Sequence, residues 1–159
     1  MKISRNNQIC WRVGMLAVLL MAGSCADTAH DFHSLPSEGW YKRSTEVFSV
    51  AVPDSLARYN VSLHLRHDTR FRYQDLWLYV WYATPSLDTL LCDTVRVPVA
   101  GPDGQWLGKG WGSLYQVTVP LRYPLSVVAG DSARLRVRPA MKESYLEGIT
   151  EVGVSLKAQ

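Results

Sequence analysis

The sequence lacks an apolar run long enough to cross a bilayer as a helix. Its uninterrupted apolar segment, residues 13–22, is about half of the roughly 20 residues that such a helix needs. Three positive charges precede it, at Lys2, Arg5 and Arg12, and Gly23-Ser24-Cys25 follows it. This order predicts a lipoprotein signal peptide over residues 1–24, cleavage before Cys25 and attachment of lipid to the Cys25 thiol. An ordinary signal peptide cut near Ser24, with Cys25 left free, is the alternative.

Cysteine is scarce, with three in 159 residues. Cys10 leaves with the signal peptide and Cys25 takes the lipid, so no disulfide is possible within the mature chain. The remaining thiol, Cys92, stands between Leu91 and Asp93 in an apolar stretch. We therefore predict that Cys92 is a small buried core residue.

The mature chain also has no excess of charge of either sign. Residues 1–24 hold three of the 17 Lys and Arg and none of the 14 Asp and Glu, so the mature formal charge is 14 minus 14, or zero. Nucleic-acid binding needs a basic surface that displaces counterions, and it is not predicted here. The nearest basic runs are Arg66, Arg70 and Arg72, and Arg134, Arg136 and Arg138. On a strand the second run forms a solvated stripe, while Leu135 and Val137 point inward.

A helical pattern of apolar residues is missing as well, since no window of a dozen residues shows the i, i+3, i+4, i+7 stripe. The apolar period is two, which predicts an all-β fold, an antiparallel β-sandwich of jelly-roll or immunoglobulin-like type, or a barrel. The predicted strands are residues 47–52, 58–66, 76–82, 89–99, 114–121, 133–138 and 149–156. Residues 76–82 (LWLYVWY) are apolar on both faces and predict a central strand that is buried on both sides.

The domain organisation follows from composition. A signal peptide (1–24) precedes a lipidated, flexible tether (25–39), which is polar and contains Pro36 and Gly39, and then a single β-domain (40–159). Turns are expected at residues 53–55 and 85–86, and a long structured turn at the glycine-rich residues 101–112. Residues 141–148 are expected to form a short helical turn.

No constellation of residues predicts catalysis or metal binding. His64 and His67 point to opposite faces of a strand, and His30 and His33 have no ordered scaffold in the tether. Residues 108–112 are not followed by the helix that a phosphate loop requires, and Ser113 lacks the nucleophile-elbow pattern. We predict no enzyme activity, metal, cofactor or small-molecule substrate. The aromatic load, with Trp77, Trp81, Trp106 and Trp111 in two clusters, leaves two hypotheses open: a subunit of an envelope assembly or a carbohydrate-binding lipoprotein.

From Gly39 onward the sequence resembles the gliding-motility lipoprotein GldH family. The matching segments are residues 63–67 (LHLRH), 73–78 (YQDLWL), 88–89 (DT), 104–110 (GQWLGKG), 112–115 (GSLY), 146–149 (LEGI) and 152–153 (VG), whereas residues 141–144 (MKES) depart from the family pattern. The resemblance implies a non-enzymatic, lipid-anchored accessory of the gliding machinery linked to type IX secretion, or a protein that supports secretion or envelope organisation in a host that does not glide. We expect it in the outer membrane facing the periplasm.

The same resemblance implies contacts with other motility or secretion proteins and with the membrane through lipid on Cys25. The exposed segments 66–73 and 106–111 supply the candidate partner-binding residues Arg66, Tyr73, Trp106, Lys109 and Trp111. The structural alternative for these residues is a glycine turn capped by packed aromatic rings.

Overall fold

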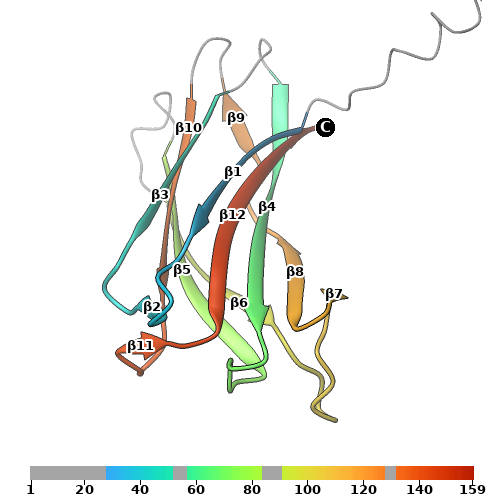
Figure 1. Ribbon diagram of the computed structural model, residues 1–159. Helices are drawn as coiled ribbons and strands as arrows, with labels where there is room; N and C mark the ends of the chain where they lie inside the picture. The colour runs from blue at the N-terminus through green and yellow to red at the C-terminus, as the bar shows by residue number, and fades with distance from the viewer. Residues whose placement is uncertain (1–27, 52–56, 84–90, 128–131) are drawn as a thin grey trace, which may run out of the picture.

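The computed structural model describes residues 28–51, 57–83, 91–127 and 132–159, and all regular structure in these ranges is β-strand (Figure 1). The strands are β1 (Thr28–Ser34), β2 (Trp40–Tyr41), β3 (Glu46–Ala51), β4 (Ala57–Asp68), β5 (Asp75–Ala83), β6 (Leu91–Pro98), β7 (Lys109–Trp111), β8 (Leu114–Pro120), β9 (Leu125–Val127), β10 (Ser132–Pro139), β11 (Tyr145–Leu146) and β12 (Ile149–Ala158). The described residues contain no helix long and apolar enough to cross a membrane.

The strands form two antiparallel layers. One sheet has the order β1-β12-β4-β8-β7, with β9 also paired to β4, and the other has the order β3-β10-β5-β6. The eight strands of six or more residues alternate between the layers, and only the step from β5 to β6 stays within one sheet. In an immunoglobulin sandwich the first two strands pair with each other, whereas here they lie in different sheets. The predicted sandwich is therefore confirmed, and its topology is that of a jelly roll.

The core lies between the two layers and is built by alternation along each long strand. β4 contributes Tyr59, Val61, Leu63 and Leu65, all at most 2% exposed. The facing strands supply Leu76, Leu78, Val80, Tyr82, Ala133, Leu135 and Val137, which are all fully buried. Burying an aliphatic side chain of this size stabilises the fold by about 1.5–3 kcal/mol, so the inward residues account for most of the cohesion between the layers.

The predicted strands are found with ends shifted by a few residues, and the inward Leu135 and Val137 are confirmed. Two burial predictions are wrong. Cys92 is exposed, because its neighbours Leu91 and Asp93 take the inward positions of β6. β5 is central in its sheet, but only one of its faces is buried, since no segment that the structure describes forms a layer over the other. The predicted turns at residues 53–55 and 85–86 lie outside the described residues.

The prediction of a flexible tether over residues 25–39 is wrong from Thr28 onward. Strand β1 pairs with β12 over seven residues, from Thr28 opposite Lys157 to Ser34 opposite Glu151. The pairing is hidden in the sequence because the inward side chains of this edge strand are mostly polar. The His33 Nδ1 atom lies 2.9 Å from a Glu46 carboxylate oxygen, and the His33 and Phe48 ring centroids are 4.5 Å apart. These two contacts join β1 to β3 of the other sheet.

The predicted helical turn at residues 141–148 is also wrong. Strand β11 in this segment pairs with β2, with Leu146 opposite Trp40. Both side chains are 1% exposed, so this small sheet closes one end of the core. Local composition could not show this, since the two strands of the pair are about 100 residues apart and each is only two residues long.

The two ends of the sandwich are fixed by the register of β12. Thr28 lies opposite Lys157 at one end of β12, and Ile149 lies opposite His67 at the other. Ten residues of strand span about 33 Å. The start of β1 is therefore separated by the length of the sandwich from the end of β4 and the hairpin β7–β8 (Figure 1).

Candidate functional site

The long turn after β6 is a closed and internally bonded loop, as predicted. The Leu107 amide donates to the Val99 carbonyl at 2.8 Å, and the Gly101 amide donates to the Gln105 carbonyl at 2.8 Å. The Gln74 side-chain amide reaches the Gly101 carbonyl at 3.2 Å. These bonds give the backbone amides and carbonyls of the loop hydrogen-bond partners without a helix, and they fix the position of the residues that follow.

A close backbone approach sets the direction in which the chain leaves this loop. Gly108 has a φ of 87°, and a Cβ there would collide with the carbonyl oxygen of Gln116 on β8. The chain then forms the hairpin β7–β8, in which Trp111 lies opposite Leu114 across a turn that contains Gly112 with a φ of 62°. Lys109 and Trp111 are thus placed on a short edge strand.

An aromatic cluster around His67 includes Tyr115 of β8 and so packs against this hairpin. His67 continues the inward alternation of β4 and is fully buried, whereas His64 bonds Thr118 and Ser155 on the outer face, as the odd spacing predicts. The His67 ring stacks on Tyr115 at 5.5 Å and lies 4.9 Å from Trp106. Burial lowers the pKa of His67, so the ring is neutral at neutral pH.

The orientation of the His67 ring is set by one hydrogen bond. Its Nδ1 lies 3.2 Å from the Asp68 carbonyl oxygen, which can only accept, so Nδ1 carries the proton. The Nε2 atom is buried without a partner among the described residues. Because Trp106 packs against this buried ring, its role is structural support, in agreement with the structural alternative for that residue.

The hairpin borders a hollow of about 680 Å³ on the surface. Its lining includes Arg66, Lys109, Trp111, Leu114 and Tyr115. Trp111 is 92% exposed and Leu114, which lies opposite it across the hairpin, is 46% exposed, so two apolar residues adjoin on the surface. An exposed apolar patch that is rimmed by polar side chains, here Arg66 and Lys109, is typical of a surface that a partner covers.

Arg66 is held in a fixed position at the edge of this hollow. Its Nε donates to the Gln116 side-chain oxygen at 3.0 Å, and one terminal nitrogen donates to Glu151 at 2.5 Å. The guanidinium also lies over the Phe32 ring of β1, at 5.7 Å from its centroid. A guanidinium restrained in this way loses little conformational entropy when a partner binds.

Tyr73 does not share this hollow. It lines a separate one with Arg70, Arg72 and Glu143. A hydrogen bond from the phenol to Glu143 raises the pKa of Tyr73; the pKa of Glu143 is lowered, first by a backbone hydrogen bond and then by the bond from Tyr73. The structure thus brings Arg66, Lys109 and Trp111 together and leaves Tyr73 in a different place.

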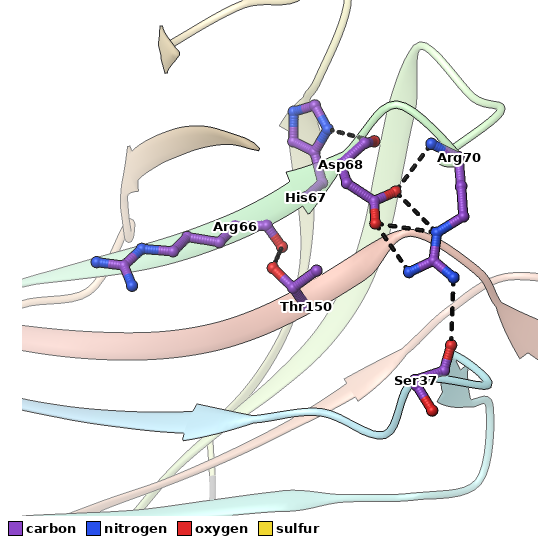
Figure 2. Close-up of polar contacts among 6 residues, drawn as sticks. All are labelled: Ser37, Arg66, His67, Asp68, Arg70 and Thr150. Atoms are coloured by element: carbon purple, nitrogen blue, oxygen red, sulfur yellow. Dashed lines mark hydrogen bonds and ion pairs between the residues drawn. The ribbon is translucent and has the colours of Figure 1, made fainter. Parts of the chain in front are cut away.

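The turn after β4, which lines the second hollow, is held by a charged pair (Figure 2). The Arg70 guanidinium donates to both carboxylate oxygens of Asp68, with distances from 2.8 to 3.2 Å, and one terminal nitrogen reaches the Ser37 carbonyl at 3.5 Å. These bonds from Arg70 lower the pKa of Asp68. On β12, the Thr150 hydroxyl donates to the Arg66 carbonyl at 3.2 Å. Sequence inspection singled out none of these bonds.

Across the described residues, no group of three or more His, Cys, Asp and Glu side chains could hold a metal ion. His30 and His33, which were placed in a flexible tether, instead occupy opposite faces of β1. The side chains grouped around the hairpin hollow are aromatic, cationic and apolar.

Comparison with known sequence families identifies the family of the chain. The sequence model of the GldH lipoprotein family matches residues 27–156. The chain belongs to the GldH lipoprotein family. The matched range begins one residue before β1 and includes both sheets, so membership in the GldH family rests on the whole sandwich and not on one motif.

Two relatives carry the GldH name. The chain is 29% identical over 150 residues to the gliding motility lipoprotein GldH of Flavobacterium johnsoniae, with 90% of this chain and 92% of the relative covered. It is 25% identical over 125 residues to a gliding motility lipoprotein GldH homolog of Christiangramia forsetii, with 74% and 76% covered. A structure of Eiger TNF from S. frugiperda covers 82% of this chain and 90% of its own at 13% identity, with a TM-score of 0.37, which is too low to indicate a shared fold.

Proposed function

We propose that this GldH-family protein is a non-enzymatic, lipid-anchored accessory of the gliding machinery linked to type IX secretion, and that it acts through protein contacts in the envelope. The observation that carries the proposal is the position of the exposed Trp111 hairpin, at the end of the sandwich opposite the start of β1. Cys25 lies three residues before Thr28. A lipid on Cys25 would therefore hold the domain with Trp111, Lys109 and Arg66 directed away from the membrane.

The contact surface is tested by site-specific photo-crosslinking in native membranes. A photoreactive amino acid at position 111 should form a crosslink to another motility or secretion component, because this side chain projects from the edge of the sandwich. The matched control is the same probe at Lys157, which is exposed at the other end of β12. Equal crosslinking from both positions, or none from position 111, argues against a contact at the hairpin.

The anchor is tested by Cys25→Ala. We expect this variant to remain unacylated and to leave the membrane fraction, and normal acylation would refute the site. Protease accessibility in intact cells, compared with cells whose outer membrane is opened, tests the proposed location on the periplasmic face of the outer membrane. A deletion strain scored for both spreading and secreted-protein output separates a role in movement from one in secretion alone.

A carbohydrate-binding lipoprotein is the second candidate, and one observation favours it. Trp77 is 41% exposed on the outer face of β5, where an indole ring can stack on a sugar. Quenching of tryptophan fluorescence by a panel of envelope and extracellular polysaccharides tests this function. A flat response across the panel eliminates it.

A further inference from the structure

The outer face of the sheet β3-β10-β5-β6 carries two parallel rows of side chains that the proposed function does not use. In the register of β5 and β10, Arg138 lies opposite Tyr79 and Arg136 lies opposite Trp81. We call this surface the arginine–aromatic face, and its members are Trp77, Tyr79 and Trp81 of β5 and Arg134, Arg136 and Arg138 of β10. Side chains two apart on a strand share a face, so each row runs straight along the sheet.

The rings of this face are partly covered by one of its arginines. The Arg138 guanidinium lies over Trp81 at 5.2 Å and over Tyr79 at 5.6 Å from the ring centroids. Stacking of this kind holds a guanidinium in place while its N–H groups stay free at the edge of the plane. The ring surfaces under Arg138 are not open to a sugar. What the face offers instead is guanidinium N–H donors, which anions accept hydrogen bonds from.

Among the described residues, no carboxylate balances the positive charge of the three arginines on this face. Within the described ranges Arg134, Arg136 and Arg138 make no ion pair. In the described parts of these four strands, the carboxylate on the same surface is Asp75, whose Oδ1 lies 2.8 Å from the Nε atom of Arg96. Because the mature chain has no net charge, three unpaired guanidiniums in a row are a local excess that attracts anionic partners.

A basic hollow continues the face at one end. It has a volume of about 380 Å³, and its charged lining residues are Lys42, Arg43, Arg138 and Lys142. The Lys42 ammonium donates to the Lys142 carbonyl at 3.1 Å, which holds the two segments together. No carboxylate lines this hollow. The arginine row and the hollow therefore form one continuous cationic surface that Arg138 joins.

We propose that the arginine–aromatic face and the basic hollow bind an acidic, extended polypeptide segment of a partner protein. The three rings and three guanidiniums are the side chains that dominate binding energy at protein interfaces. Carboxylates of Asp and Glu can take paired hydrogen bonds from each guanidinium. An extended segment laid along β10 has side chains on one face at about the same spacing as the arginines.

The test measures binding of fluorescently labelled poly-L-glutamate to the full protein, purified from membranes in detergent, by anisotropy. The variant Arg136→Gln with Arg138→Gln should bind about tenfold more weakly than the native protein. The matched control is Arg58→Gln with Arg122→Gln, which removes the same charge at exposed positions outside the face. All four side chains are at least partly exposed, so thermal unfolding should confirm that both variants are folded.

Three outcomes overturn the inference: no saturable binding, equal weakening in both double variants, or displacement of the peptide by polygalacturonate more effectively than by unlabelled poly-L-glutamate. The last outcome assigns the face to an anionic polysaccharide. This test is independent of the proposed contact at the hairpin. Trp111→Ala should leave poly-L-glutamate binding unchanged whether or not position 111 contacts a partner.

Discussion

The Phe32 ring of β1 packs against Gly153 of β12 where no side chain could fit. A Cβ on Gly153 would collide with three atoms of the ring. Phe32 in turn lies 5.4 Å from the His64 ring and beneath the Arg66 guanidinium. This contact links the edge strand that follows the anchor to Arg66, which borders the Trp111 hollow.

Gly153→Ala should therefore destabilise the protein by about 1–2 kcal/mol, because the ring must leave its place. Denaturant unfolding measures the change. In the Phe32→Ala background the same Gly153→Ala change should cost far less, since the obstructing ring is gone. Additive effects of the two substitutions would show that they do not interact.

The buried His67 should make stability depend on pH in the mildly acidic range. Its folded pKa lies below the ordinary value of 6.5, so the unfolded chain binds the proton more readily. The resulting stability is present above pH 6.5 and is lost as the pH falls through the lowered folded pKa. His64 has a lowered pKa for the same main reason, burial, and adds to the slope.

His67→Phe keeps an aromatic ring between Tyr115 and Trp106 and removes the titrating group. The free energy of unfolding of this variant should fall less between pH 7 and pH 5 than that of the native protein. Chemical denaturation at a series of pH values measures both slopes. An unchanged slope would contradict the assignment to His67.

The two tryptophans of the glycine-rich segment should behave differently. Trp106→Ala removes a ring that packs on His67 and should destabilise the fold by about 2 kcal/mol. Trp111→Ala removes a side chain that is 92% exposed and should change stability by less than about 0.5 kcal/mol. Thermal or denaturant unfolding separates the two, and a large loss with Trp111→Ala would mean that its ring is packed.

Cys92 should react with a maleimide in the folded protein. Its side chain lies on the exposed face of β6, opposite Trp81 of β5. We expect one label per lipidated molecule without denaturant and none in Cys92→Ser, as measured by intact mass. Labelling that requires denaturant would show instead that Cys92 is buried, as its place in an apolar stretch of the sequence had predicted.

The sequence by itself determined the fold class, the family and the places of the strands of six or more residues from β3 onward. Strand signals are local, since the alternation of Tyr59, Val61, Leu63 and Leu65 is visible in one short segment. The glycine-rich turn is likewise predicted by the composition of its own residues. The alternation also predicted that Arg134, Arg136 and Arg138 share a face, and that face is now seen.

Only the tertiary structure decided which distant strands pair and what lies outside the sandwich. β1 became a strand because β12 binds its backbone and Glu46 meets His33, and neither contact leaves a local apolar pattern. Cys92 was misplaced because the face of a strand is set by the sheet that it joins. The arginine–aromatic face exists because β10 and β5, separated by four other strands in the chain, lie side by side in register. The free energy that favours these pairings comes from contacts between segments far apart in the sequence, so it cannot be predicted from the residues of one segment.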